Sequence, residues 1–377
     1  MRIGNATDQY KITSSYTATK PKGPSFGPQG PRVPDIDRIA TSHYDPKLAY
    51  VMAVISTWAY ADERSLAERL RYYGIEGARV RRITVQNNAL LVVATAYLVQ
   101  SHSGGVGILA FRGTDPASFI TILADGETMQ RPFAGGVVHS GFYTNVEAVW
   151  DDVTECLDAA LNATHIEDNA GKRTKLDKPL ESLYVTGHSL GGAMAVLAAA
   201  RISQGGFDAA KQALRGVYTF GQPMVGDKAF AEGCQKAFGP ILFRHVYRND
   251  LVPHLPPKSE LDYQHTGTER QAAALNKAWK DGGLPSDRVS VAAALVEVAI
   301  NAVEARLTPS KALHGLSIDD HMPSNYVDVS RYTIDPNTGY VVAGRNWAPP
   351  WLPQDLGSAL RKFWGGGNGS AASHPTA

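Results

Sequence analysis

One run of the chain, residues 183–200, constrains both the fold and the chemistry. A short apolar strand leads into Gly187, Ser189 and Gly191, spaced as Gly-x-Ser-x-Gly, and a helix rich in alanine, methionine and leucine follows. A strand that turns directly into a helix forces the central serine into a strained backbone conformation, and its close neighbours must lack a Cβ. The serine oxygen then stands at the positive end of the helix, where developing negative charge is stabilised. The pattern predicts that Ser189 is a catalytic nucleophile.

The order of the expected elements indicates the fold class. We expect helices over 44–71 and 145–161, and strands over 80–85, 89–100, 106–112, 183–185, 217–220 and 241–247. Strands that alternate with helices favour a mainly parallel sheet. A hairpin expected at 101–105 makes part of that sheet antiparallel. The sequence therefore predicts an α/β fold, with a mixed, mainly parallel sheet and helices on both faces.

Composition divides the chain into three parts. Residues 1–44 are rich in proline, glycine, serine and lysine, which is typical of an arm that lies extended on the surface or is disordered. Residues 45–345 contain no obvious linker or repeat and are expected to form one catalytic domain, with a helical insert at about 270–310. Residues 346–377 form a C-terminal extension that ends in a flexible Gly/Ser tail.

Charge and cysteine content exclude several classes of protein. A formal net charge of +1 gives no long-range attraction to nucleic acid. The two cysteines, Cys156 and Cys234, permit at most one disulfide, and the helix-like surroundings of Cys156 favour two buried, reduced thiols. No cysteine or histidine spacing typical of a metal site is present, so we expect no metal or organic cofactor.

The first thirty residues contain no apolar core of signal-peptide length, and no stretch approaches the ~18 apolar residues that span a bilayer. The default expectation is therefore a soluble, cytoplasmic protein with no transmembrane segment. Secretion by a route without a cleaved signal stays open. The oligomeric state is not indicated.

A serine nucleophile needs a base to take its proton and an acid to orient that base. Asp250 directly follows the strand expected at 241–247 and precedes a proline-rich loop, while its rival Asp227 looks like the start of a helix. For the base, His321 is favoured, and His314, seven residues earlier, is the main competitor. His245, His254 and His265 also follow the serine; the first sits within a strand, and the other two are close to the acid in sequence.

Six motifs resemble those of the class 3 lipases, the fungal-lipase-like branch of the α/β-hydrolases. They occur in order along residues 45–345, at Ile108–Thr114, Val138–Tyr143, Thr186–Gly192, Tyr218–Gly226, Arg248–Pro257, and the Asp-His pair at 320–321 followed by Tyr326. In many members of that family two residues separate the histidine from the tyrosine, whereas four separate them here.

The resemblance assigns a role to each matching position. It implies Ser189 as the nucleophile, Asp250 as the orienting acid and His321 as the base. The backbone amides of Thr114 and Leu190 would bind the oxyanion, with the Thr114 hydroxyl as a further donor. The implied function is a serine carboxylester hydrolase acting on lipid esters at a lipid–water interface, most simply a triacylglycerol lipase. Phospholipase A1, a short-chain soluble esterase, a peptidase or thioesterase, and a non-catalytic binding module stay as alternatives.

Two further segments and two neighbouring side chains have more than one interpretation. Residues 115–130 occupy the lid position of the family, and a short amphipathic flap and a simple surface loop are equally compatible with them. The apolar helix expected over 288–307 carries a polar stripe with two acids. Packing into the core is favoured over a cap on the acyl pocket or contact with a lipid surface. His188 is expected to pack under the strand-to-helix turn that carries Ser189, hereafter the elbow. Arg112 is expected to form an ion pair that holds the fold.

Overall fold

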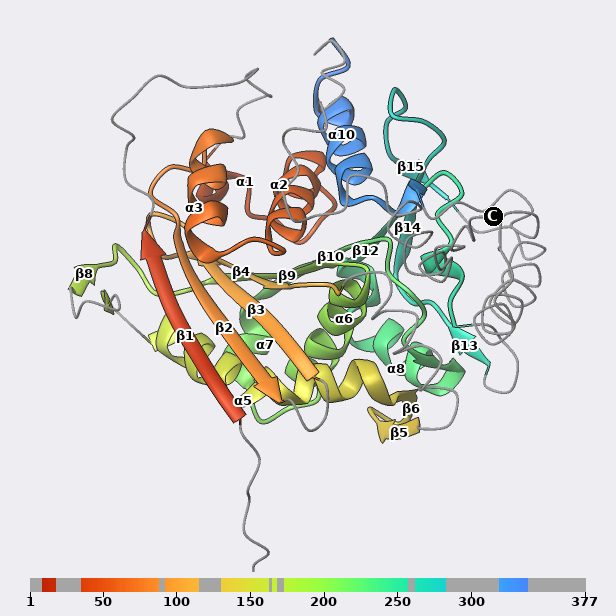
Figure 1. Ribbon diagram of the computed structural model, residues 1–377, viewed down its shortest axis with the longest axis horizontal. Helices are drawn as coiled ribbons and strands as arrows, with labels where there is room; N and C mark the ends of the chain where they lie inside the picture. The colour runs from red at the N-terminus through yellow and green to blue at the C-terminus, as the bar shows by residue number, and fades with distance from the viewer. Residues whose placement is uncertain are drawn as a thin grey trace, which may run out of the picture.

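A long, twisted sheet runs through the centre of the computed structural model (Figure 1), which describes residues 9–17, 35–87, 92–114, 130–162, 165–167, 173–256, 262–282 and 319–337. Within these residues the sheet has nine strands in the order β1-β2-β3-β4-β9-β10-β12-β14-β15. They are β1 (Gln9–Thr17), β2 (Arg79–Asn87), β3 (Val92–Gln100), β4 (Val106–Phe111), β9 (Ser182–His188), β10 (Leu214–Phe220), β12 (Leu242–Tyr247), β14 (Thr268–Ala272) and β15 (Lys280–Asp281).

Strand direction changes once on each side of the sheet. The five strands from β4 to β14 are parallel to their neighbours, whereas β1, β2, β3 and β4 pair antiparallel, as do β14 and β15. The carboxyl ends of β9, β10 and β12 therefore meet at one edge of the parallel part, where α/β proteins place their ligands. The expected mixed, mainly parallel sheet is confirmed.

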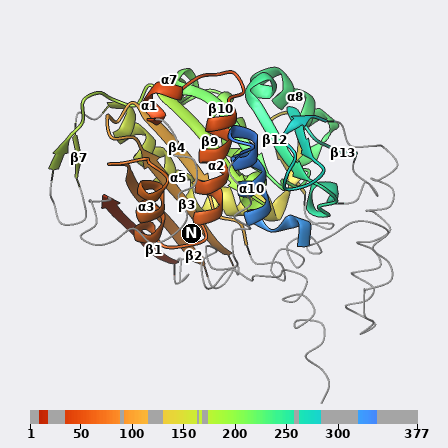
Figure 2. The same cartoon turned by 90° about the horizontal axis from the view of Figure 1, so that it is seen from above.

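Helices cover both faces of the sheet, as Figures 1 and 2 show. One layer consists of α1 (Ile36–Ile39), α2 (Pro46–Trp58), α3 (Glu63–Tyr72) and α10 (Pro323–Ile334). The opposite layer consists of α5 (Ser140–Asn162), α6 (Leu190–Ser203), α7 (Asp208–Ala213) and α8 (Lys228–Phe238). α10 comes from the far end of the described chain, yet it packs beside α2. This packing brings the turn before α10 back to the sheet.

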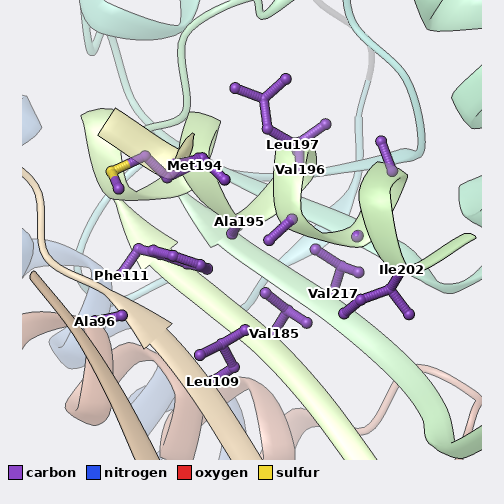
Figure 3. Close-up of a cluster of buried hydrophobic side chains, with 14 of the residues drawn as sticks. Ala96, Leu109, Phe111, Val185, Met194, Ala195, Val196, Leu197, Ile202 and Val217 are labelled. Carbon is purple, nitrogen blue, oxygen red and sulfur yellow. The ribbon is translucent and has the colours of Figure 1, made fainter. Parts of the chain in front are cut away.

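Two apolar clusters hold the layers together. Because successive side chains of a strand point to opposite faces of the sheet, one strand contributes residues to both clusters. On β4, Leu109 and Phe111 join the cluster under α5 and α6, while Ile108 and Ala110 join the cluster under α2 and α10. Figure 3 shows the first cluster, in which Met194 of α6 lies over the strands. Burying each such aliphatic or aromatic side chain contributes about 1.5–3 kcal/mol. The parallel strands β4, β9, β10 and β12 are buried on both faces, which is why their sequences are mostly apolar, whereas β14 is only partly buried.

Shorter elements lie around this frame. A four-stranded sheet has the order β13-β11-β6-β5, and a hairpin pairs β7 with β8. Their bounds are β5 (Gln130–Phe133), β6 (Gly136–His139), β7 (His165–Glu167), β8 (Arg173–Lys175), β11 (Gly226–Asp227) and β13 (Tyr263–Gln264). Three 3₁₀ turns, η1 (Gly239–Ile241), η2 (Val252–His254) and η4 (Asp319–His321), occur at strand and helix ends.

The single helix expected over 44–71 is wrong. Two helices, α2 and α3, occupy this stretch, and a turn over residues 59–62 separates them. Asp62 has an extended backbone, and its carboxylate accepts a hydrogen bond from the Ser65 N–H at 2.8 Å, which makes it the N-cap of α3. An aspartate in this place starts a new helix, after α2 has already ended at Trp58. The apolar periodicity continues across the break and conceals it.

The segment expected to be an arm contains two elements. β1 adds nine residues to the edge of the sheet, in antiparallel register with β2 from the pair Gln9–Asn87 to the pair Thr17–Arg79. α1 follows, and its Asp37 accepts hydrogen bonds from the hydroxyls of Ser101 and Ser103 in the β3–β4 hairpin. We did not predict either element from the sequence.

Several expectations lie outside the described residues. They are the flap or loop over 115–130, of which only Gln130 is described, the helix over 288–307, His314 and the C-terminal extension. The described start of the insert expected at about 270–310 contains no helix, since β14 ends at Ala272 and β15 covers Lys280–Asp281. Cys156 and Cys234 are described, and both side chains are buried, as expected. Among the described helices, none is both long and apolar enough to cross a membrane.

Candidate active site

The turn between β9 and α6 has the strained geometry that its glycines predict. Ser189 has a φ of 58° and a ψ of −130°, values that residues with a Cβ rarely adopt. A Cβ on Gly187 would lie 2.1 Å from the Gly191 carbonyl oxygen, and one on Gly191 would lie 2.2 Å from the Phe111 carbonyl oxygen. Strand, turn and helix can approach so closely only because both residues are glycines.

The end of β4 lies directly against this turn. A Cβ on Gly113 would lie 2.7 Å from the carbonyl oxygen of His188, the residue before the serine. Thr114 follows Gly113 in the chain, so its backbone runs beside Ser189. Leu190 is the first residue of α6, and a backbone N–H in the first turn of a helix has no intrahelical acceptor. Both positions proposed for oxyanion binding are thus next to the serine.

Two other turns bring an aspartate and a histidine together, although 71 residues separate them. Asp250 lies just after β12 in residues 248–250, hereafter the acid turn, and His321 ends η4, residues 319–321, hereafter the base turn. The Nδ1–H of His321 donates to Oδ2 of Asp250 at 2.8 Å. Both side chains are almost completely buried. Nε2 of His321 is buried too and has no hydrogen-bond partner among the described residues.

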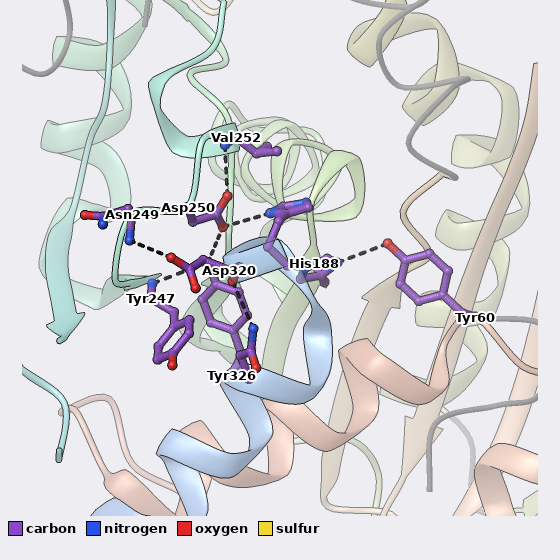
Figure 4. A network of polar contacts seen from close by, with 10 residues as sticks. Tyr60, His188, Tyr247, Asn249, Asp250, Val252, Asp320 and Tyr326 are labelled. Carbon is purple, nitrogen blue, oxygen red and sulfur yellow. Dashed lines mark hydrogen bonds and ion pairs between the residues drawn. The ribbon is translucent and has the colours of Figure 1, made fainter. Parts of the chain in front are cut away.

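Asp250 is held by two more donors, which Figure 4 shows. The backbone N–H of Val252 donates to Oδ1 at 2.9 Å, and the Tyr326 hydroxyl donates to Oδ2. Charge-assisted bonds of this kind hold the carboxylate in a fixed place. Burial, and then the nearby Asp250 charge, hold the pKa of Tyr326 well above its usual value, so this phenol stays a donor. Tyr326 lies in the first turns of α10, and the longer spacing after the histidine still brings it to the acid.

Gly221 is a further site residue, and sequence reasoning missed its role. It follows β10 with a φ of +57°, and a Cβ there would lie 2.7 Å from both Cε1 and Nδ1 of His321 and 2.8 Å from Oδ2 of Asp250. The side chains of Asp250 and His321 therefore pack directly against the backbone of Gly221. The Tyr218–Gly226 motif contains this glycine, but no local pattern shows what lies above it.

The acid turn and the base turn also contact each other away from the Asp–His bond. Oδ2 of Asp320 accepts from the backbone N–H of Asn249 at 3.3 Å (Figure 4). The Arg248 guanidinium lies 3.6 Å from Oδ1 of the same carboxylate. Arg248 has a φ of 47°, so the acid turn is itself strained. The carboxylate of Asp320 therefore links the two turns through atoms that take no part in the Asp250–His321 bond.

The competing residues have other partners. Asp227 caps α8 by accepting from the Phe230 N–H at 2.9 Å, the helix start expected for it. His245 lies within β12, and its Nδ1–H donates to the Thr219 carbonyl at 3.1 Å. His265 contacts the Pro253 carbonyl at 2.7 Å. His254, in η2, is buried.

Two other kinds of chemistry have little support in the described ranges. There, no group of three or more His, Cys, Asp or Glu side chains is arranged to hold a metal ion. Burial raises the pKa of the Cys234 thiol to about 12, which keeps it protonated and a poor nucleophile.

Comparison with known proteins identifies the family. Residues 108–260 match the family model described as "Lipase (class 3)". A lipase of Rhizopus niveus is 28% identical over 250 residues, which cover 66% of this chain and 55% of that protein. A secreted mono- and diacylglycerol lipase of Fusarium solani is 32% identical over 194 residues, covering 51% of this chain and 49% of that protein. The chain thus spans about half the length of the curated relatives it matches.

Comparison with solved structures also finds lipases. The crystal structure of a lipase from Rhizopus microsporus var. chinensis superposes with a TM-score of 0.51 at 22% identity, covering 81% of this chain and 96% of that one. The agreement confirms an α/β-hydrolase fold for this chain.

The comparisons also correct the expected cytoplasmic location, which is wrong. The Fusarium solani relative is described as secreted, and the comparisons therefore point to an extracellular rather than a cytoplasmic protein. The cytoplasmic location was expected only because no apolar stretch of signal-peptide length was found. A short apolar leader takes no part in the folded domain, so the domain itself does not report the compartment. Over residues 108–260, this chain therefore resembles the class 3 lipases.

Proposed function

We propose that the protein is a serine carboxylester hydrolase that acts on lipid esters, with acylglycerols as its substrate class. One observation carries the proposal: His321 and Asp250 form a buried 2.8 Å bond that leaves Nε2 of the imidazole without a partner among the described residues. An imidazole bound in this way through Nδ1 offers its Nε2 lone pair as a base. The strained turn at Ser189 lies at the same edge of the sheet.

In the proposed reaction, Nε2 of His321 takes the proton from the Ser189 hydroxyl as the oxygen attacks the ester carbonyl. The carbonyl oxygen becomes an oxyanion, which the backbone N–H groups of Thr114 and Leu190 bind. His321 then gives its proton to the departing alcohol and leaves an acyl-serine. Water, deprotonated by the same imidazole, releases the fatty acid. Loss of one oxyanion donor typically costs about 10²–10³ in turnover.

The substrate class rests on the relatives, since one of them is described as a mono- and diacylglycerol lipase. We also propose that the enzyme works outside the cell, as that relative is described as secreted. Residues 45–345 are the proposed catalytic domain, and β1 from the preceding arm completes the edge of its sheet.

Acid release measured in a pH-stat tests the proposal. The wild-type protein and Ser189→Ala would be compared on emulsified triacylglycerol and on a soluble short-chain ester. We expect turnover of the emulsion that Ser189→Ala abolishes, together with labelling of Ser189 by a fluorophosphonate probe. Equal activity of the two proteins would overturn the proposal. Turnover of the soluble ester alone would leave the triad in place and change the substrate class.

A further inference from the structure

His188, the residue before the proposed nucleophile, contacts the base turn directly. Its ring is buried and lies against the ring of His321, with centroids 4.5 Å apart and planes inclined by 33°. On the side away from His321, the His188 ring faces the Tyr60 hydroxyl, as Figure 4 shows. His188 was expected only to pack under the elbow, but its polar atoms have specific partners.

The hydrogen bonds of His188 define its protonation. Nε2 lies 2.8 Å from the backbone carbonyl oxygen of His321, and since a carbonyl can only accept, Nε2 carries the proton. Nδ1 lies 3.1 Å from the Tyr60 hydroxyl. Burial, and then repulsion by His321, keep the pKa of His188 well below its usual value. The ring is therefore neutral, and Nδ1 accepts from the Tyr60 hydroxyl.

The bond to the His321 carbonyl complements the bond to Asp250. Asp250 fixes Nδ1 of the His321 ring, but a bond to one ring atom leaves the ring free to swing if its backbone shifts. The His188 bond fixes that backbone from the side of the elbow, so the proposed nucleophile and the proposed base are joined through adjacent residues. A catalytic base must be held to a fraction of an ångström for proton transfer.

The same chain of contacts reaches the oxyanion side. A Cβ on Gly113 would lie only 2.1 Å from the Tyr60 hydroxyl, so the phenol lies against the backbone that leads to Thr114. Tyr60 follows α2, and a helix end packed in the core is a rigid support. The phenol therefore contacts both the oxyanion segment and the ring that holds the base.

We propose that His188, held in its Nε2-protonated form by Tyr60, is a positioning residue that fixes the backbone of His321 for proton transfer. This inference rests on the proposed hydrolase function. His188 itself touches neither the substrate nor the reacting atoms; it acts through the His321 carbonyl. The geometry also predicts which replacement keeps the function. Glutamine can place an amide N–H near the position of Nε2, whereas phenylalanine fills the space without a donor.

The chain offers a matched control in His245. It is also a fully buried histidine bonded to a backbone carbonyl, that of Thr219, with a tyrosine hydroxyl, that of Tyr44, 3.4 Å from its other nitrogen. Its side chain has no contact with His321 among the hydrogen bonds and ring contacts of the described residues. His245→Phe therefore reproduces the loss of a buried imidazole and its two polar contacts without removing a contact to His321, and phenylalanine keeps a ring in the stack on Phe220.

Steady-state kinetics on a soluble ester, with melting temperatures for each variant, tests the proposal. We expect His188→Phe to lower kcat by about 10–100-fold with KM changed less than about twofold, the usual cost of misplacing a catalytic group by up to ~1 Å. His188→Gln should recover kcat to within about fivefold of the wild type, and His245→Phe should reduce only the melting temperature. If His188→Phe retains the kcat of His245→Phe, or if His188→Gln is no better than His188→Phe, the proposal is overturned.

Two measurements keep the test decisive. If His188→Phe does not fold, Tyr60→Phe takes its place, because it leaves the imidazole and removes only the hydroxyl; a kcat reduced by about 3–10-fold is expected, and an unchanged kcat overturns the proposal. ¹⁵N NMR of histidine-labelled wild-type protein should show His188 protonated at Nε2 and not titrating between about pH 5 and 9. A titrating or Nδ1-protonated His188 overturns the inference even in an active enzyme. Wild-type protein without esterase activity or probe labelling would instead reject the proposed function.

Discussion

Substituting Gly221 by alanine tests the architecture of the site most directly. Gly221 lies at the end of β10 beneath the pair formed by His321 and Asp250 and donates its backbone N–H to the His245 carbonyl at 3.0 Å. It has a positive φ of +57°. An alanine methyl group would therefore strain the backbone and displace the pair above it.

The two effects can be estimated separately. An alanine at a left-handed position costs about 1 kcal/mol of stability. The new methyl would lie 2.7 Å from the imidazole, whereas ordinary contact begins at 3.4 Å, so the ring has to retreat by about 0.7 Å. The carboxylate, at 2.8 Å, has to retreat by a similar distance. A displacement of this size typically costs about 100-fold in rate, equivalent to about 2.7 kcal/mol of transition-state stabilisation.

Gly206→Ala is the matched control. Gly206 also has a positive φ, of +83°, but nothing lies within 4 Å of the Cβ that alanine would add. It follows α6 and is far in sequence from the acid and base turns. The control therefore carries the backbone strain alone, which costs about 1 kcal/mol of stability.

The assay compares kcat/KM on a soluble ester for Gly221→Ala, Gly206→Ala and the wild type, with urea unfolding to confirm that each variant is folded. We expect a loss of about 100-fold for Gly221→Ala and a nearly unchanged value for Gly206→Ala. The rate of fluorophosphonate labelling of Ser189 should fall in parallel, since it depends on the same base. If a folded Gly221→Ala keeps kcat/KM within about threefold of the control, the pair does not rest on this backbone, and the reasoning is wrong.

Three further predictions follow from the same contacts. Asp250→Asn should lower kcat by up to about 10⁴, because an amide cannot replace the carboxylate that orients His321; kinetics on a soluble ester checks it, and full activity would mean that another acid serves. Asp320→Ala should lower kcat about tenfold at constant KM, since the acid and base turns lose their link. Asp320→Asn, which keeps an acceptor oxygen, should restore most of the rate, and equal rates for the two variants would contradict this role. Burial raises the pKa of Tyr97 to about 12 and holds that of Tyr326 well above its usual value. The stability that these buried, neutral phenols contribute is therefore complete below about pH 10 and is lost as the pH rises. Each should lower the free energy of unfolding by about 1.4 kcal/mol per pH unit there, because only the unfolded state releases the proton; urea titrations between about pH 9 and 11 measure it, and a flat profile would refute it.

Local patterns were sufficient to predict much of this molecule. The apolar runs predicted the parallel strands β4, β9, β10 and β12 but not β14, whose residues are mostly polar. The Gly-x-Ser-x-Gly spacing predicted the strained turn at Ser189. Both are short-range effects, since a strand needs only alternation or continuous burial, and a tight turn needs residues without a Cβ. Asp250 and His321 were chosen by their place in the chain order, and the 2.8 Å bond between them agrees with that choice.

The features that sequence reasoning missed depend on contacts over long separations. Tyr60 meets His188 across 128 residues, and His188 meets the His321 carbonyl across 133. No periodicity or spacing in the chain encodes such contacts. The break at Asp62 was missed for the opposite reason, since a capping aspartate is a weak local signal within a long apolar pattern.

Strand order explains why the site needs a glycine where it has one. The proposed nucleophile follows β9, Gly221 follows β10 and the acid follows β12, and these are neighbouring strands of the parallel sheet. Adjacent strands lie about 4.8 Å apart, so Ser189 and Asp250 stand at the ends of strands separated by about 10 Å. An imidazole that serves both has to lie over the strand between them, and no side chain can stand there. His321 therefore comes from the turn before α10, and its ring lies where it would overlap with a Cβ on residue 221.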